Sequence, residues 1–238
     1  MKTRIKAVGC AVMLSLCFAG PAAFGGLFED GAAAYEQKDY ATALRFWRSL
    51  AEQGNPATQF NIGYMYREGQ GVPKDYVQAL AWYRKAADQG YAMAQHNLGV
   101  MYDEGLGVPR DYLQALVWYR KAAGQEVAQA QFNLGVMYNN GEGVPQDYGQ
   151  ALVWYRKAAD QGYTMAQNNL ATMYSNGKGV PQDYVQAHLW YNLAAAGFPA
   201  EDADDRKKAA NNRDIIAAKM TPAQIAEAQR LAREWKPK

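Results

Sequence analysis

The 238-residue chain contains few of the residues that build metal sites and disulfide frameworks, with 2 Cys and 2 His in all. This scarcity disfavours a structural zinc site and a disulfide-stapled fold. An excess of charge of one sign is also absent, since 25 basic and 23 acidic residues leave a formal net charge of +2. A nucleic-acid-binding protein would ordinarily be far more basic. We therefore expect no metal, no cofactor and no nucleic-acid partner.

Apolar residues, in contrast, are abundant. Hydrophobic residues make up 49% of the chain and aromatic residues 13%, including 17 Tyr and 6 Trp. Burial of that much apolar surface can offset the ordering entropy, so intrinsic disorder is excluded for the bulk of the chain. The length alone suggests one or two domains.

Residues 1–23 have the three-part pattern of a secretory signal peptide. Basic residues open the segment, an apolar run covers 7–20, and Pro21 then precedes small residues. We expect cleavage near Ala22 or Ala23. The alternative is an uncleaved membrane anchor, but a spanning helix needs about 20 apolar residues and Pro21 ends this run earlier. Lipid attachment at Cys17 is disfavoured because a bulky Leu precedes it.

Removal of the leader changes the charge and the cysteine content of the chain. The leader holds both Cys and three of the basic residues, which leaves 22 basic against 23 acidic residues and a net charge of −1. We expect an exported protein, periplasmic or secreted, with no stable membrane insertion after cleavage.

A repeat of 36 residues organises most of the remaining chain. The blocks 55–90, 91–126, 127–162 and 163–198 align without a gap. Such self-similarity is the signature of a stacked repeat architecture. Identical residues recur at equivalent positions, among them Gly69, Gly105, Gly141 and Gly177, and Trp82, Trp118, Trp154 and Trp190.

Each block predicts a helix, a loop and a second helix. In the second block, Ala94, Leu98 and Met101 share one face of the first helix. The loop ends that helix, because its Gly accepts the left-handed conformation and its Pro cannot continue a helix. An Asp with a Gln three residues later then predicts an N-cap for the second helix, at Asp75, Asp111, Asp147 and Asp183.

The two ends of the array depart from the repeat pattern. Residues 24–54 keep the phase of a second helix but lack the Gly-Val-Pro loop, which predicts an atypical N-terminal repeat or cap. Residues 199–238 predict C-terminal capping helices, the last of which starts at a capping box from Thr221 to Gln224. Polar end helices keep a stacked array soluble.

The block at 94–123 reads Ala-x-x-x-Leu-Gly-x-Met-Tyr-x-x-Gly-x-Gly-Val-x-x-Asp-Tyr-x-x-Ala-x-x-Trp-Tyr-x-x-Ala-Ala. It resembles the Sel-one-like repeat, a relative of the tetratricopeptide repeat. The resemblance covers 55–198 fully and 28–54 in part, and the tail is similar to those of short exported bacterial members. It implies an all-α fold, an α/α superhelical solenoid of antiparallel helix pairs. It also implies an adaptor that contacts other proteins at the bacterial envelope or a host interface.

We therefore predict a monomeric, non-catalytic scaffold that binds an unknown protein or peptide. Two alternatives stay open. One is a purely structural envelope component, and the other is the β-lactam-binding or peptidoglycan-associated activity that the resemblance to cysteine-rich relatives implies. Ser175 and Lys178 match the Ser-x-x-Lys pattern of penicillin-recognising enzymes, but they fall where a helix ends and the partner motifs are absent. His96 and His188 lack metal-ligand spacing.

First-helix positions that differ between blocks predict where a partner binds. Their offsets of 0, 3, 7 and 10 place them on one stripe of the helix, and in tetratricopeptide repeats the matching stripe lines the concave groove. We expect exposed aromatic anchors among them. The alternative is an unconstrained surface. The predicted groove residues are Ala57, Phe60, Tyr64, Arg67, Met93, His96, Val100, Asp103, Gln129, Phe132, Val136, Asn139, Met165, Asn168, Thr172 and Ser175.

Other recurring residues have structural interpretations. The Trp and Tyr ladder indicates helix packing rather than ligand stacking, and the Arg-Lys pairs indicate a solvated face opposed by nearby acids. The acids at 201–205 lack the ligand pattern of a calcium loop and favour the start of a helix. The constant residues Asn61, Asn97, Asn133 and Asn169 are interpreted as structural hydrogen-bonding groups, with peptide clamping as a second possibility.

Overall fold

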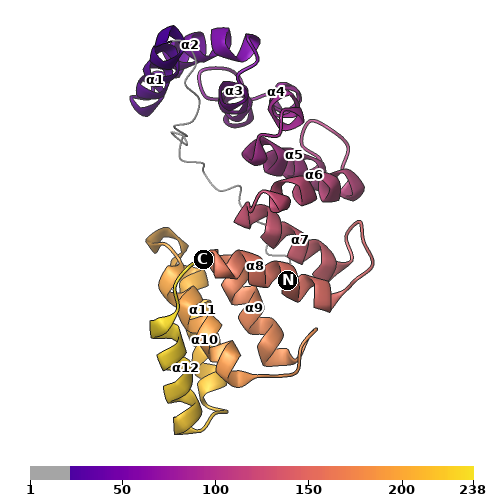
Figure 1. The fold of residues 1–238 in the computed structure, drawn as a ribbon, viewed down its shortest axis with the longest axis vertical. Helices are drawn as coiled ribbons and strands as arrows, with labels where there is room; N and C mark the ends of the chain where they lie inside the picture. Colours follow the sequence, from indigo (N-terminus) through magenta and orange to yellow (C-terminus); the bar gives the residue numbers. More distant parts are fainter. Residues whose placement is uncertain (1–21) are drawn as a thin grey trace. The chain divides into compact units, whose positions relative to one another are not determined.

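The structure is a computed structural model that describes residues 22–238, so the predicted leader lies almost wholly outside the described residues. Over this range the chain forms α-helices and one 3-10 turn and no strand, which confirms the all-α prediction (Figure 1). The helices are α1 Ala22–Glu36, α2 Tyr40–Glu52, α3 Pro56–Glu68, α4 Tyr76–Asp88, α5 Ala92–Glu104, α6 Tyr112–Gly124, α7 Ala128–Asn140, α8 Tyr148–Asp160, α9 Thr164–Asn176, α10 Tyr184–Gly197, η1 Ala200–Asp202, α11 Ala203–Ala217 and α12 Pro222–Glu234.

The loop inside each repeat ends one helix and starts the next. Gly141 at the end of α7 has a φ of 73°, a left-handed conformation that favours glycine. The Asp111 side chain accepts hydrogen bonds from the backbone N–H groups of Leu113 and Gln114 at the start of α6. Equivalent caps form at the other three second helices, which confirms the predicted Asp N-caps.

The described residues divide into two compact units. Unit 1 comprises the chain up to residue 94 together with 106–109, and unit 2 comprises 95–105 and 110–238. In unit 1, the helices from α1 to α4 each pack on the next helix along the chain. In unit 2, the same holds from α6 to α10, as expected for stacked helix pairs.

In the repeats at 55–90, 91–126 and 127–162, the core contains a tyrosine that lies directly on a glycine of the first helix, whereas the fourth repeat has Ala171 at the glycine position. In unit 2 the Tyr119 side chain is 1% exposed, and a Cβ added at Gly99 would lie 2.6 Å from its ring. Trp118 and Trp190 are buried, whereas Trp154 is half-buried. The recurring Trp and Tyr side chains therefore pack between helices, as predicted.

A ladder of glutamines links successive helices and was not singled out by helical periodicity. In unit 2, the Gln131 side chain donates to the carbonyl of Ala123 at 3.4 Å and accepts from Gln161 at 2.9 Å. The last carbonyls of a helix lack the usual partner four residues later, and the Gln131 amide adds a hydrogen bond to the Ala123 carbonyl, which also accepts from the Glu126 backbone N–H. The sequence signal is a Gln constant in all four blocks, at Gln59, Gln95, Gln131 and Gln167.

The recurring Arg-Lys pairs lie on a largely exposed face, and their lysines also contact aromatic rings. In unit 2, the Lys121 ammonium lies 4.0 Å from the ring centroid of Trp118. Its neighbour Arg120 donates to the hydroxyl of Tyr138 at 2.8 Å. Lys121 thus covers the Trp118 ring by a cation–π contact, while Arg120 holds the neighbouring tyrosine by a hydrogen bond.

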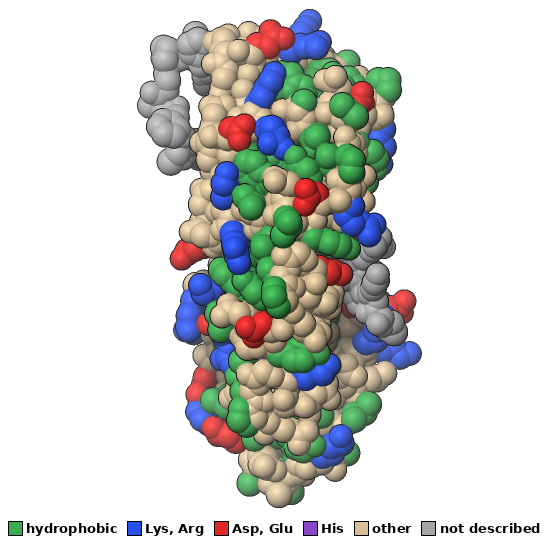
Figure 2. Space-filling model, turned by 90° about the vertical axis from the view of Figure 1, so that its right-hand side faces the viewer, with side chains coloured by type: hydrophobic (Ala, Val, Ile, Leu, Met, Phe, Trp, Pro, Cys, Tyr) green, Lys and Arg blue, Asp and Glu red, His purple; other side chains and the backbone are tan. Residues whose placement is uncertain are grey.

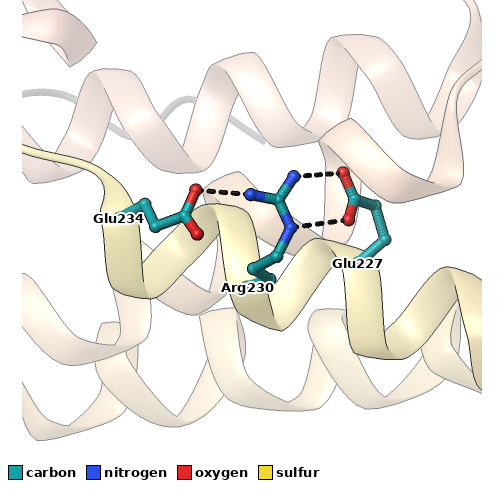
Figure 3. Close-up of polar contacts among 3 residues, drawn as sticks. All are labelled: Glu227, Arg230 and Glu234. Atoms are coloured by element: carbon teal, nitrogen blue, oxygen red, sulfur yellow. Dashed lines mark hydrogen bonds and ion pairs between the residues drawn. The ribbon is translucent and has the colours of Figure 1, made fainter.

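The predicted C-terminal capping helices are α11 and α12, and both pack against α10. Thr221 and Gln224 form the predicted capping box at the start of α12. One face of α12 carries the side chain of Arg230 between Glu227 and Glu234, with the guanidinium bidentate to Glu227 (Figure 3). These polar contacts stabilise the exposed side of the last helix.

Candidate functional site

The predicted groove residues lie on the first helices of the repeats, but the structure places them at different depths. Four of them, Phe60, Arg67, His96 and Phe132, are buried. The other twelve are half-buried and reach the surface. The stripe is therefore part core and part surface.

The expectation of exposed aromatic anchors at Phe60 and Phe132 is wrong. Phe132 in unit 2 is 2% exposed, and its ring lies 5.6 Å from that of Tyr155 and 5.3 Å from that of Tyr163. Phe60 in unit 1 is buried between two tyrosines in the same way. Each phenylalanine lies four residues after the first residue of its helix, and its side chain points toward the second helix, so these rings hold the repeat together.

His96 fills the same position in the second repeat. Its ring lies 5.9 Å from that of Tyr119, as a phenylalanine would. Its Nε2 is 3.3 Å from Nδ2 of Asn133 and its Nδ1 is 3.2 Å from Oδ1 of Asn97. With Asn133 as donor, Nε2 accepts, and Nδ1 carries the proton and donates to Asn97. The constant asparagines at 97 and 133 are therefore structural hydrogen-bonding groups.

Asp103 carries the one carboxylate of the predicted stripe. Its Oδ2 accepts a hydrogen bond from the Tyr119 hydroxyl at 3.3 Å. Burial and, to a smaller extent, the negative charge of Glu142 together raise the pKa of this carboxyl to about 6. At pH 7 Asp103 is therefore a charged acceptor supported by a buried phenol, and it can accept hydrogen bonds from a bound segment.

In unit 2 the half-buried part of the stripe combines an apolar and a polar row. Val100, Val136 and Thr172 form one row, and Asp103, Asn139 and Ser175 form the other. The Thr172 hydroxyl is 2.9 Å from that of Tyr191, so the fourth repeat also joins a stripe residue to a buried phenol. In unit 1, Tyr64 is half-buried and lies 4.9 Å from the guanidinium of Arg67. These side chains offer both apolar contact and hydrogen bonds.

The structure gives Ser175 and Lys178 different partners. The Ser175 hydroxyl donates to the carbonyl of Thr172 at 3.0 Å. The Lys178 ammonium lies 5.1 Å from the ring centroid of Tyr148. Ser175 thus makes a hydrogen bond at the end of a helix, and Lys178 makes a cation–π contact. Neither contact is the Ser–Lys pair that would activate a nucleophile.

His188 is buried, and desolvation with the nearby Arg213 charge lowers its pKa. Over residues 22–238, His, Cys, Asp and Glu side chains nowhere gather in groups of three that could hold a metal.

Among the helices between residues 22 and 238, none combines the length and apolarity needed to cross a bilayer. One face of the molecule shows basic and acidic side chains interspersed (Figure 2).

Comparison with known proteins gives one family and several solved structures. The Sel1 repeat family matches five segments, at residues 25–55, 56–91, 92–126, 128–163 and 164–197. The first of these covers the segment predicted as an atypical N-terminal repeat, where the structure has the helix pair α1 and α2. None of the curated proteins compared with the chain matches it significantly.

Among solved structures, a Sel1 repeat protein from Oxalobacter formigenes is 32% identical, with a TM-score of 0.70 over 87% of this chain and 96% of that one. The protective antigen c5321 of uropathogenic Escherichia coli, which has an SLR fold, is 31% identical, with a TM-score of 0.57 over 89% of this chain and 53% of that one. The immunity protein Pa5087 from Pseudomonas aeruginosa, at 20% identity and a TM-score of 0.53 over 92% of this chain and 84% of that one, shares the fold. The solenoid of helix pairs is thereby confirmed.

Proposed function

The chain belongs to the Sel1 repeat family, and on that basis we propose that it is an interaction scaffold that binds a peptide or protein segment on the variable stripe of its first helices. Sel1 repeat proteins are in general non-catalytic scaffolds. Repeats of this kind build extended binding surfaces from similar units. The position of the leader pattern at residues 1–23 supports an exported protein that acts in the periplasm or outside the cell.

The observation that carries the proposal is the contrast between constant and variable positions in unit 2. The constant side chains Leu98, Leu134 and Leu170 are fully buried and serve packing in every repeat. The variable residues Val136 and Asn139 reach the surface on the same helix. Residues that pack in the core meet the same neighbours in every repeat and are therefore alike. Residues that contact one partner meet different groups in each repeat and can therefore differ.

The burial of Phe60 and Phe132 changes which residues would contact the partner. The contact surface in unit 2 would consist of valine and threonine side chains flanked by Asp103, Asn139 and Ser175. Protein interfaces combine such apolar centres with hydrogen-bonding rims. A peptide whose backbone N–H groups or basic side chains reach Asp103 fits this chemistry.

Site-specific crosslinking in the native host tests the proposal. A photo-crosslinking amino acid is placed at Asn139 on the stripe of α7. The matched control carries it at Val153 on the second helix α8, whose side chain is 46% exposed. We expect one defined protein to be captured from position 139 and not from position 153, with identification by mass spectrometry.

Equal capture at both positions would contradict the assignment to the first-helix stripe. Capture from position 153 alone would place the binding face on the second helices. A variant with Val136→Glu should reduce capture at position 139 at least tenfold while its circular dichroism stays unchanged, because a charge would then occupy the centre of the contact surface.

A further inference from the structure

The last four residues of the chain form an extended tail that returns to the third repeat in unit 2. The tail, Trp235–Lys238, follows α12, and Trp235 has the extended backbone angles φ −65° and ψ 138°. The residues that receive the tail belong to α8, to the turn after it and to α10. We call them the tail site, and they are Arg156, Asp160, Gly162 and Trp190.

Two anchors three residues apart hold the tail in its site. The ring of Trp235 packs edge-on against Trp190, with 6.2 Å between the ring centroids and 75° between the planes. At the other end, the Lys238 backbone N–H donates to the carbonyl of Asp160 at 2.9 Å. The Lys238 ammonium lies 3.3 Å from the Asp160 carboxylate. The site thus binds three groups of the tail, namely an aromatic ring, an ammonium group and a backbone N–H.

The floor of the tail site is shaped by a glycine and an arginine. A Cβ added at Gly162 would lie 3.8 Å from both Trp235 and Pro237, so the tail runs in van der Waals contact along this turn. The Arg156 guanidinium lies 5.3 Å from the ring centroid of Trp190, on which Trp235 also packs. Stacked aromatic and cationic groups of this kind recur where peptides bind proteins.

The contacts around the tail include one unpaired buried donor and one solvent-exposed ion pair. The Trp190 side chain is 2% exposed, and its indole Nε1 has no hydrogen-bond acceptor among the described residues. The Lys238 side chain is 80% exposed, so its ion pair is weak. Another segment that accepts a hydrogen bond from this indole N–H would gain a contact that the tail does not make. The exposed ion pair adds little that such a segment would have to replace.

We propose that the tail site is a second docking site, distinct from the first-helix stripe. It takes an extended protein segment that has an aromatic residue followed three positions later by a lysine. The chain's own tail is its resident occupant and competes with such a partner, which makes the contact autoinhibitory. The tail supplies the pattern directly, because Trp235 and Lys238 make the two anchoring contacts.

The test uses a fluorescent peptide with the sequence of residues 233–238 and a free C-terminus, titrated against full-length protein. A tethered tail acts at an effective concentration in the millimolar range, so the wild-type site should be largely occupied. Trp235→Ala removes the main anchor of the tethered tail. We expect the peptide to bind this variant at least tenfold more tightly than it binds wild type.

Matched variants assign that binding to the tail site. Lys236→Ala changes an exposed tail residue between the anchors and should behave like wild type. Asp160→Asn in the Trp235→Ala background should weaken peptide binding several-fold, because the ion pair is lost. A peptide with Ala in place of Trp should not bind. Failure of the peptide to bind Trp235→Ala, or equal binding to wild type and to this variant, would overturn the proposal.

A disulfide provides a test that does not depend on the folding of Trp235→Ala. The Cβ position at Gly162 lies 4.0 Å from Cβ of Pro237, within the range that a disulfide spans. Gly162→Cys with Pro237→Cys, in a chain with Cys10 and Cys17 changed to Ser, should exclude the peptide when oxidised and admit it when reduced. Equal peptide binding in the two redox states would show that the tail does not cover the peptide's site.

Neither experiment depends on the first-helix stripe, so the two proposals can fail separately. Loss of partner capture at Asn139 leaves the peptide titration unchanged. An absence of peptide binding leaves the crosslinking result unchanged.

Discussion

The ring of Tyr155 on α8 lies against Gly135 on α7 so closely that a Cβ at position 135 would come within 2.5 Å of ring carbon Cδ1. Tyr155 is 2% exposed, and burial raises the pKa of its hydroxyl above the ordinary range. Gly135 lies inside a helix, where any residue could adopt the backbone conformation. Glycine is therefore required by the nearby ring and not by the backbone. This contact fixes the distance between the two helices of a repeat.

Gly135→Ala should therefore destabilise the protein although alanine has the higher helix propensity. The added methyl group must displace the Tyr155 ring, and overpacking of this kind costs about 1–3 kcal/mol. Thermal unfolding followed by circular dichroism measures the effect. Gly124→Ala is the matched control, since a Cβ there would meet nothing within 4 Å. A midpoint for Gly135→Ala equal to that of the control would contradict the packing assignment.

Trp118→Ala should be one of the most destabilising substitutions in unit 2. The side chain is 4% exposed, and removal of a buried tryptophan costs about 3–5 kcal/mol. Trp154→Ala in the next repeat should cost clearly less, because Trp154 is half-buried. Urea unfolding of both variants provides the comparison. An unchanged free energy of unfolding for Trp118→Ala would remove Trp118 from the core.

Asp111→Ala should lower the free energy of unfolding by about 1 kcal/mol, since it removes the acceptor for two backbone N–H groups at the start of α6. Asp111→Asn keeps an acceptor oxygen and should retain most of that stability. Chemical denaturation near neutral pH distinguishes the two variants. Equal losses for both would show that the charge, rather than the hydrogen bonds, stabilises this helix.

Asp103 should make the protein less stable as pH rises from about 4 to about 6. Its pKa in the folded protein is raised to about 6 by burial and by Glu142, against 3.8 as the ordinary value. The folded state therefore binds more protons than the unfolded chain between these values, and stability falls with rising pH. Asp103→Asn should gain on the order of 2 kcal/mol over wild type at pH 7.

The same comparison at acidic pH checks the sign of the effect. At pH 4 wild type and Asp103→Asn should unfold at nearly the same urea concentration, because the carboxyl is then largely protonated. Glu142→Gln removes the neighbouring charge and should give a smaller gain at pH 7. A constant difference between Asp103→Asn and wild type from pH 4 to pH 7 would argue against titration of Asp103 as the cause.

Much of the fold could be predicted from the sequence because the same helix caps and helix-ending glycines recur in four repeats. The Asp caps at 111 and 147 and the left-handed glycine at 141 depend on residues within one turn of each other. Local signals of this kind are legible in a single block. The capping box at Thr221 was predictable for the same reason.

The candidate site was harder to predict because side-chain depth depends on contacts between helices. Spacing placed Phe132 and Val136 on one stripe, yet Phe132 is enclosed by Tyr155 and Tyr163 while Val136 reaches the surface. A difference of one helical turn along a tilted helix decides between core and surface. Sequence spacing gives the direction of a side chain but not the position of its neighbour.

The sequence by itself determined the helix pairs, their boundaries and the family of the chain, since periodicity, caps and helix-ending glycines act over short distances. Only the tertiary structure decided that Arg120 reaches the Tyr138 hydroxyl, that Gln161 joins Gln131, and that Lys238 returns to Asp160. Residues 78 positions apart, as in the last pair, meet only after the intervening helices have packed. The tail site therefore has no local signal in the sequence, because it is created by the packing of helices on one another.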